Sequence, residues 1–183
     1  IKMLVGLLKP SAGTATIAGY DIQQFPQQAK QHIGFIPDRP FVYDKLSGRE
    51  FLRFIGDLYG MDERAITTRS EDFLELFKLL PWGDELIESY SHGMRQKIAM
   101  SAALLHQPRV LVVDEPMVGL DPKGARLVKH ILRSLCDRGT TIFMSTHTLE
   151  VAEQMCDRIG IIQAGEIIAL GTKDELRQRV QGE

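Results

Sequence analysis

The feature that most constrains this chain is a run of four apolar residues that ends in two carboxylates and a proline. Residues 110–113 read Val-Leu-Val-Val, and Asp114, Glu115 and Pro116 follow. A continuous apolar run is typical of a strand buried on both faces of a parallel sheet. Its acidic end then lies at the carboxyl edge of the sheet, where α/β folds bind ligands. A buried strand whose acids merely begin the next loop explains the pattern equally well.

The composition favours one globular domain with room for a small subdomain. The chain has 183 residues, of which 44% are hydrophobic and 25% charged. A net charge of −2 provides no basic field for nucleic acid or anionic lipid. Cys136 and Cys156 lack metal-site or redox spacing, which indicates a reducing compartment. No apolar stretch reaches transmembrane length and no secretory signal is present, so a role at a membrane requires a partner.

The spacing of apolar residues in the first half of the chain predicts two strands followed by a helical insertion. Residues 1–8 resemble the end of an apolar helix without an N-cap or an initiating methionine, so we expect the chain to be a fragment. Short strands are expected at 14–18 and 33–36, with a surface loop or weak helix at 23–31. From Ser47 the apolar spacing becomes helical and predicts two helices. We therefore divide the chain into three parts, which are 1–45, a helical subdomain at 46–89, and 90–183.

In the second half of the chain, the spacing of apolar residues again predicts alternating helices and strands. Ser91 is an N-cap candidate for a helix to 105, which the strand at 110–113 follows. Asp121 and Pro122 then open a helix, and a buried strand at 140–144 and a helix at 148–157 come after it. The chain is expected to end with a hairpin of 158–162 with 166–170 and a last helix capped by Thr172 and Glu175. These elements predict an α/β fold with a mainly parallel sheet, flanking helices and a small antiparallel piece.

Several polar residues lie where such a fold would place them at the sheet edge. Asp114 ends a buried strand and suits Mg²⁺, which prefers one or two carboxylates with phosphate oxygens and waters. Glu115 is placed to orient or deprotonate a water. His147 ends another apolar strand, and a parallel sheet would bring it beside Glu115. Taken alone, His147 is better explained as a residue that leads into a helix, beside Thr146.

Two further segments have weaker signals of ligand binding. Ser91, His92 and Gly93 combine a hydroxyl and a flexible backbone at a helix start, which binds anions through unpaired N–H groups and the helix dipole. An ordinary capped helix explains the same residues. Asp38 stands between prolines, where turn chemistry is the simpler explanation.

The order of these segments resembles that of a known family, the nucleotide-binding subunits of ATP-binding cassette (ABC) transporters. Residues 90–94, Tyr-Ser-His-Gly-Met, resemble the signature motif, which is usually Leu-Ser-Gly-Gly-Gln. Residues 110–115 resemble the Walker B strand, residues 119–122 the D-loop, and residues 145–147 the switch histidine. Asp38 falls where the family usually has the Q-loop glutamine. Four motifs in order make the resemblance specific.

The resemblance implies a P-loop NTPase-like fold that binds ATP and Mg²⁺ and hydrolyses ATP at the cytoplasmic face of the cell membrane. It implies a transmembrane permease subunit as partner, contacted by the helical subdomain, and a second nucleotide-binding subunit in a head-to-tail dimer. No nucleic acid partner is expected. The departures from the usual motifs resemble those of the export-type branch.

The resemblance also implies a role for each site residue. Asp114 would hold Mg²⁺, with Asp38 as a second candidate, while Glu115 acts as general base and His147 contacts the γ-phosphate. On the opposite subunit's nucleotide, Ser91 and Gly93 would touch the γ-phosphate, with His92 next to them. Asp121 would bridge the two active sites.

Three departures from the family pattern qualify these roles. No Gly-Lys pair occurs in the chain, so the phosphate-binding loop Gly-x-x-x-x-Gly-Lys-Ser/Thr is missing. We therefore expect this fragment by itself to bind ATP poorly and not to hydrolyse it. His92 and Met94 replace a glycine and a glutamine of the signature, and Asp38 replaces an amide.

Two other classes of function remain open. A soluble ABC-type ATPase that acts on DNA or ribosomes usually has a coiled-coil insertion or two fused cassettes, and this chain shows neither. A non-hydrolytic regulatory module is the other alternative, against which the intact Asp114, Glu115 and His147 argue. The transported substrate, the direction of transport and the identity of the permease cannot be read from these residues.

Overall fold

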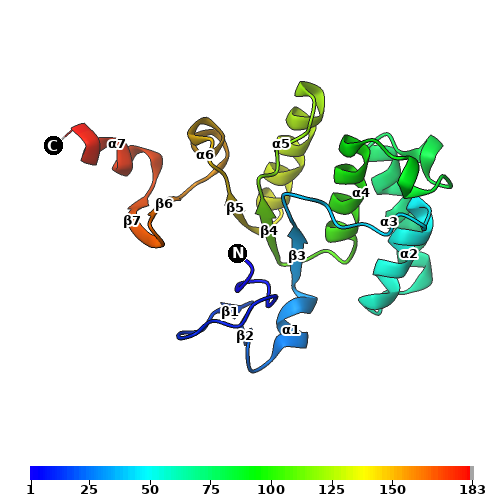
Figure 1. Ribbon diagram of the computed structural model, residues 1–183, viewed down its shortest axis with the longest axis horizontal. Helices are drawn as coiled ribbons and strands as arrows, with labels where there is room; N and C mark the ends of the chain where they lie inside the picture. The colour runs from blue at the N-terminus through cyan, green and yellow to red at the C-terminus, as the bar shows by residue number, and fades with distance from the viewer. Residues whose placement is uncertain (182–183) are drawn as a thin grey trace. The chain divides into compact units, whose positions relative to one another are not determined.

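The computed structural model describes residues 1–181, which belong to two compact units, Ile1–Ser145 and Thr146–Glu183 (Figure 1). The elements of the first unit are, in chain order, β1 (Thr16–Ile17), β2 (Tyr20–Asp21), α1 (Pro26–Gln31), β3 (Ile33–Ile36), α2 (Gly48–Leu58), α3 (Glu63–Leu76), the 3₁₀ turns η1 (Leu80–Trp82) and η2 (Ile87–Ser89), α4 (His92–Leu105), β4 (Val110–Asp114), α5 (Pro122–Asp137) and β5 (Thr141–Ser145).

A parallel sheet of three strands, in the order β3-β4-β5, forms the centre of the first unit. The central strand β4 is the apolar run of the sequence, and its Leu111, Val112 and Val113 are at most 1% exposed. Burial of such side chains is the main favourable contribution to folding. The predicted α/β fold class, with its mainly parallel sheet, flanking helices and small antiparallel piece, is confirmed.

The strand predicted at 140–144 forms as β5, but the prediction that it is buried is wrong. Phe143 is 46% exposed, and Thr141 is exposed as well. Among the described residues β5 pairs only with β4, so it is an edge strand. An edge strand is covered less completely than a central one, although its residues are equally apolar.

Helices pack on the sheet, and two more helices form the predicted helical insertion. The α4 helix packs on β3, α5 packs on β5, and α2 and α3 pack on each other and on α4 (Figure 1). Ser47 and Glu50 form a reciprocal capping box that starts α2. Ser91 and Asp121 cap α4 and α5, as predicted. Among residues 1–181, no helix combines the length and the apolar character needed to span a membrane.

The N-terminal residues differ from the prediction. Residues 2–6 form turns and not an α-helical end, with a single helical hydrogen bond from the Val5 N–H to the Ile1 carbonyl at 3.1 Å. Val5 is nevertheless buried, in a small apolar cluster with Ile17 of β1, Ile22 and Ala29 of α1.

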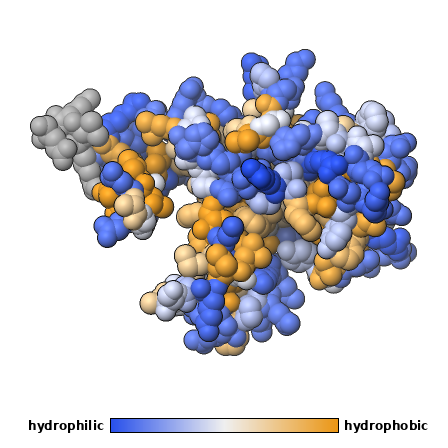
Figure 2. Space-filling model, in the orientation of Figure 1, coloured by the Kyte–Doolittle hydropathy of each residue, from blue (hydrophilic) through white to orange (hydrophobic). Residues whose placement is uncertain are grey.

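The second unit contains α6 (Leu149–Met155), β6 (Ile159–Gln163), β7 (Glu166–Gly171) and α7 (Lys173–Gln181). The predicted hairpin forms from β6 and β7, with a register irregularity at Ile161 and Ile162. The predicted capping box also forms, since the Thr172 N–H donates to Glu175 Oε2 at 2.8 Å and the Glu175 N–H donates to Thr172 Oγ1 at 3.3 Å. Figure 2 shows hydrophobic surface over the part of the chain that contains the hairpin. Ile162 of β6 and Ile167 of β7 are 66% and 65% exposed.

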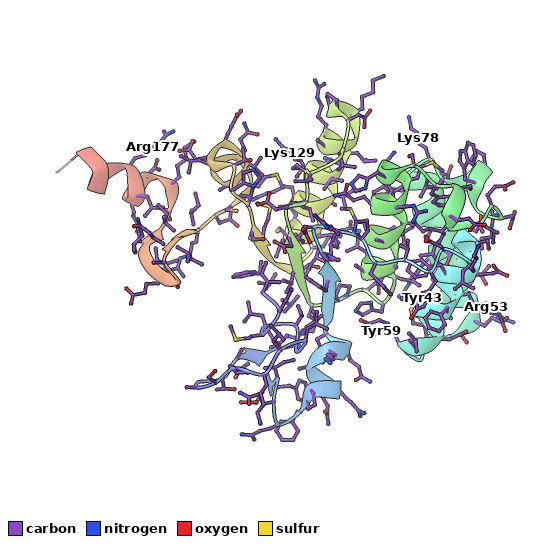
Figure 3. The ribbon with its side chains drawn as sticks, viewed as in Figure 1. Tyr43, Arg53, Tyr59, Lys78, Lys129 and Arg177 are labelled. Atoms are coloured by element: carbon purple, nitrogen blue, oxygen red, sulfur yellow. The ribbon has the colours of Figure 1, made fainter. Side chains whose placement is uncertain are left out.

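A stacked aromatic pair joins the helical insertion to the sheet. The ring of Tyr59, which follows α2, stacks on the ring of His106, which follows α4, with centroids 3.7 Å apart (Tyr59 is labelled in Figure 3). His106 Nε2 donates to the Ile33 carbonyl at 3.1 Å, so this nitrogen carries the proton. Among the described residues, His106 Nδ1 is buried without a hydrogen-bond partner. Burial lowers the pKa of His106 to about 4, although the bond to Ile33 acts in the opposite direction.

The depressed pKa of His106 predicts an acid-sensitive fold. The folded protein keeps His106 neutral down to about pH 4, whereas the unfolded chain takes up the proton near pH 6.5. The free energy of unfolding should therefore fall as the pH drops through this window. Between pH 7 and pH 5 we expect His106 to contribute a loss of about 1–2 kcal/mol.

Chemical denaturation of the wild type and His106→Phe at both pH values measures this contribution. The phenylalanine retains the stack on Tyr59 but does not titrate, so its loss of stability on acidification should be smaller by about that amount. Equal pH dependence of the two proteins would contradict the assignment.

Candidate functional site

The carboxyl ends of the three parallel strands meet at one edge of the sheet. Ile36 of β3 pairs with Val113 of β4, and Asp114 of β4 pairs with Ser145 of β5. The chain leaves β3 two residues before Asp38 and leaves β4 directly before Glu115. The register therefore places three chain exits, with their polar residues, at the edge where α/β folds bind ligands.

Asp114 is oriented by a hydroxyl from the neighbouring strand. Ser145 Oγ donates a short hydrogen bond to Asp114 Oδ1, and both residues are half-buried. Ser145 belongs to the Ser-Thr-His segment, but the sequence alone suggested no role for it. Such a bond fixes the rotamer of a carboxylate and leaves its other oxygen to bind a ligand.

The donor set at this edge fits Mg²⁺ better than a metal that needs a protein cage. Residues 1–181 contain no group of three or more His, Cys, Asp or Glu side chains placed to hold an ion. Mg²⁺ does not require one, because it is commonly held by one or two carboxylates together with waters and phosphate oxygens. The half-buried carboxylate of Asp114 meets that requirement.

Glu115 has a strained backbone at the end of β4. Its φ of +50° lies in the left-handed region, a backbone conformation that residues other than glycine rarely adopt. The Glu115 N–H donates to the Ser145 carbonyl at 3.1 Å, and its carbonyl accepts from the Val118 N–H at 3.2 Å. The sheet and the following turn thus hold the residue in this conformation. Strain of this kind is concentrated at functional sites, where it sets the direction of a side chain.

The start of α4 presents backbone donors at the predicted anion site. Ser91 Oγ accepts from the Met94 N–H at 3.3 Å, and the Ser91 carbonyl accepts from the Arg95 N–H at 2.9 Å. Within residues 1–181 neither the His92 N–H nor the Gly93 N–H has a protein acceptor among the hydrogen bonds formed. Both donors lie in the first turn of a helix of 14 residues, where the helix dipole favours an anion.

The residues predicted for the D-loop lie against the predicted signature. A Cβ atom on Gly119 would come within 2.5 Å of Cδ2 and Nε2 of His92 and would displace this ring, and the φ of +77° at Gly119 also favours glycine. Asp121 caps α5, where its Oδ1 accepts from the Gly124 N–H at 2.9 Å. The structure thus gives Asp121 the capping role expected from sequence, and a role across a dimer stays a prediction.

The structure supports the predicted positions of two further site residues, Asp38 and His147, less directly. Asp38 is exposed in the segment after β3. His147 belongs to the second unit, two residues after Ser145, so its pairing with Glu115 stays a prediction.

Sequence reasoning missed several polar residues around the site. Arg95 donates to Asp44 Oδ1 at 2.5 Å, to the Tyr90 carbonyl at 3.2 Å and to the Glu88 carbonyl at 3.1 Å, so it fixes the turn before Ser91. Gln96, which lies within the helix predicted up to residue 105, is 1% exposed. A signal for Gln96 was available, because it stands four residues before Met100 and eight before Leu104 on the buried face of α4.

The comparison with protein families shows to which family the chain belongs. The family model of ABC transporters matches residues 1–118, which is more than half of the chain. The chain belongs to the ABC transporter family. The resemblance read from the motifs is therefore confirmed.

Individual members of the ABC transporter family match along the whole chain. The linearmycin resistance ATP-binding protein LnrL of Bacillus subtilis is 38% identical over 183 residues, which are 100% of this chain and 59% of LnrL. The daunorubicin resistance ATP-binding protein DrrA3 of Streptomyces coeruleorubidus is 36% identical, over 100% of this chain and 58% of DrrA3. The chain thus spans less than two thirds of either relative.

Among solved structures of the ABC transporter family, one described as the ATP binding subunit of an ABC transporter superposes with a TM-score of 0.92. It is 31% identical, and the match covers 98% of this chain and 75% of the solved one. The observed fold is therefore that of ABC transporter ATP-binding subunits.

The strain at Glu115 predicts an unusual order of stability between two variants. Glu115→Ala and Glu115→Gly both remove the carboxylate, but only glycine adopts a φ of +50° without steric cost. We expect Glu115→Gly to be more stable than Glu115→Ala by about 1 kcal/mol in the intact subunit.

Urea denaturation of both variants measures the difference. Lys78, with a φ of +58° on the exposed surface after α3, provides a matched control in which glycine should again be more stable than alanine. An alanine variant as stable as glycine at position 115 would exclude backbone strain there.

Proposed function

We propose that this chain forms the ATPase core of the nucleotide-binding subunit of an ABC exporter, which hydrolyses ATP with Mg²⁺ to power a separate transmembrane permease. The observation that carries the proposal is the register of β3, β4 and β5, which gathers Asp114, Glu115 and Ser145 at one edge of the sheet. Membership of the ABC transporter family supports the choice of ATP among possible phosphate ligands.

In this proposal Asp114 holds Mg²⁺, directly or through water. The hydroxyl of Ser145 keeps the Asp114 carboxylate in one orientation. When bound, Mg²⁺ would neutralise charge on the β- and γ-phosphates during transfer. Asp38 is the second candidate for the metal, since it follows the neighbouring strand at the same edge.

Glu115 is the proposed general base. Its backbone is anchored on Ser145 of the neighbouring strand and held in a left-handed conformation, so its position is set by the sheet. A carboxylate held in this way accepts the proton of an attacking water. His147 is proposed to donate a hydrogen bond to the γ-phosphate.

Completion of the site is proposed to require a second subunit in a head-to-tail dimer. The Ser91 hydroxyl and the N–H groups of His92 and Gly93 would bind the γ-phosphate of the nucleotide held by the other subunit. The exposed positions of Ser91 and His92 support this, because an anion from another chain can reach them. Asp121 would then link the two active sites through the contact between its segment and the signature.

The direction of transport is inferred from the relatives. LnrL and DrrA3 are named for resistance to linearmycin and to daunorubicin, and resistance of this kind is consistent with export. We therefore propose an export-type system, with the subunit at the cytoplasmic face of the membrane. The net charge of −2 gives no support to a nucleic acid partner.

The permease is proposed to dock on an aromatic patch of the helical subdomain at 46–89 and the segment before it. The patch consists of Phe41, Tyr43 and Phe54, which are 77%, 46% and 37% exposed. Tyr43 lies between the other two, with ring centroids 5.7 Å from Phe41 and 5.3 Å from Phe54 (Tyr43 is labelled in Figure 3). Clustered exposed aromatics are typical of the energetic centre of a protein interface.

The catalytic proposal predicts the effect of replacing Glu115 by glutamine. In the intact subunit, Glu115→Gln should lower the turnover of Mg²⁺–ATP by about two to four orders of magnitude, the usual contribution of a general base. ATP affinity should stay near that of the wild type, because the change removes a proton acceptor and not a phosphate contact.

Steady-state phosphate release and equilibrium ATP binding test this prediction. Glu166→Gln, an exposed acid on β7, is the matched control and should leave both quantities unchanged. Unchanged turnover in Glu115→Gln would remove Glu115 from the reaction.

The docking proposal predicts a separation of ATP hydrolysis from assembly. Phe41→Ala should weaken the association of the intact subunit with its permease about tenfold or more, since a buried aromatic anchor is lost. Hydrolysis by the subunit alone should not change. Phe25→Ala, which alters a phenylalanine 47% exposed outside the patch, serves as control.

The affinity of the subunit for its permease is measured by co-purification from detergent-solubilised membranes at increasing concentrations of the subunit. Equal association of the Phe41 variant and the Phe25 variant would show that the permease binds elsewhere.

A further inference from the structure

Gln96 carries a buried amide that has no partner within the described chain. The residue is 1% exposed, and neither Oε1 nor Nε2 has a hydrogen-bond partner among residues 1–181. Met100 and Leu104 continue the same buried face of α4 with apolar side chains. An unpaired buried amide costs free energy that an apolar side chain of similar length would avoid. Its presence therefore points to a contact made in another state of the protein.

The group that faces this amide is the backbone of Gly119, in the segment between β4 and α5. A Cβ atom on Gly119 would lie 3.6 Å from Gln96 Oε1, and the Gly119 carbonyl oxygen lies 3.8 Å from the Cβ position of Gly93. The His92 ring stands against the same glycine. The Gly119 backbone thus lies over the first turns of α4, with Gln96 behind it.

The Gly119 peptide is able to rotate toward the amide. It is exposed, has a φ of +77°, and takes part in no backbone hydrogen bond within residues 1–181. Of the neighbouring bonds, the one from the Leu120 N–H to the Met117 carbonyl is long, at 3.4 Å, and the one from the Val118 N–H to the Glu115 carbonyl is 3.2 Å. Glycine changes its backbone angles at little steric cost.

We propose that Gln96 is a positioning residue, whose amide hydrogen-bonds to the Gly119 backbone when ATP closes the dimer. The inference rests on the proposed function. In that state the bond fixes the segment that connects Glu115, four residues before Gly119, with Asp121, two residues after it. Gln96 thereby links the signature helix to the general base within one subunit, although it touches neither the nucleotide nor the reacting water.

The test compares Gln96→Met with the wild type in the intact subunit. Methionine has a similar length and no hydrogen-bonding amide, so thermal stability should be equal or higher. The turnover number should fall about tenfold, as expected for the loss of one hydrogen bond made in the hydrolysing state, while KM for Mg²⁺–ATP stays within about twofold.

Ser70 provides a matched control. Its hydroxyl is likewise buried and without a partner among residues 1–181, but it lies on α3 in the helical subdomain. Ser70→Ala should raise stability without changing turnover. A second readout is hydrogen exchange of the segment 117–120 in a Glu115→Gln background, where ATP should slow exchange when Gln96 is present and not when methionine replaces it.

Three outcomes would overturn the inference. Turnover of Gln96→Met within twofold of the wild type would show that the amide is not used in hydrolysis. A loss of stability as large as the loss of activity would assign Gln96 a structural role. ATP-dependent protection of 117–120 that persists in Gln96→Met would place the contact elsewhere. Absence of ATP hydrolysis in the wild-type intact subunit would instead refute the proposed function.

Discussion

The hydrogen-bond register between β4 and its two neighbours is the constraint on which the rest of the structure depends. It pairs Asp114 with Ser145, and it allows the Ser145 hydroxyl and carbonyl to hold the carboxylate of Asp114 and the N–H of Glu115. A shift by one residue would turn every side chain of β4 to the opposite face. Because Leu111, Val112 and Val113 are completely buried, such a shift is strongly disfavoured, and core packing thereby fixes the acidic pair.

Near this edge of the sheet, two residues have a backbone conformation or an unpaired polar group that costs free energy. Glu115 adopts a left-handed backbone, and Gln96 keeps a buried amide without a partner among the described residues. Both departures lie close to Gly119, where His92 and Gln96 of α4 meet the segment after β4. Departures of this kind also occur elsewhere, as at Lys78 and Ser70, but those near Gly119 lie beside the residues proposed for the site. The proposed function gives this site a role in nucleotide hydrolysis.

The helical insertion is connected to this site by the packing of α2 and α3 on α4 and by individual side-chain contacts. Arg95 ties the turn before Ser91 to Asp44, in the segment that also carries Phe41 and Tyr43. The Tyr59–His106 stack joins the end of α2 to the end of α4. A partner bound at the aromatic patch would therefore be linked to the signature through a short series of direct contacts.

Sequence alone determined the elements whose signals are local. The capping residues Ser91, Asp121 and Thr172 start helices where predicted, because a cap needs only its own first turn. The apolar run at β4 gave the central strand, and the ordered motifs gave the family. Tertiary structure alone decided the strain at Glu115 and the unpaired amide of Gln96. Both depend on contacts between segments distant in sequence, and no local pattern of residues encodes them.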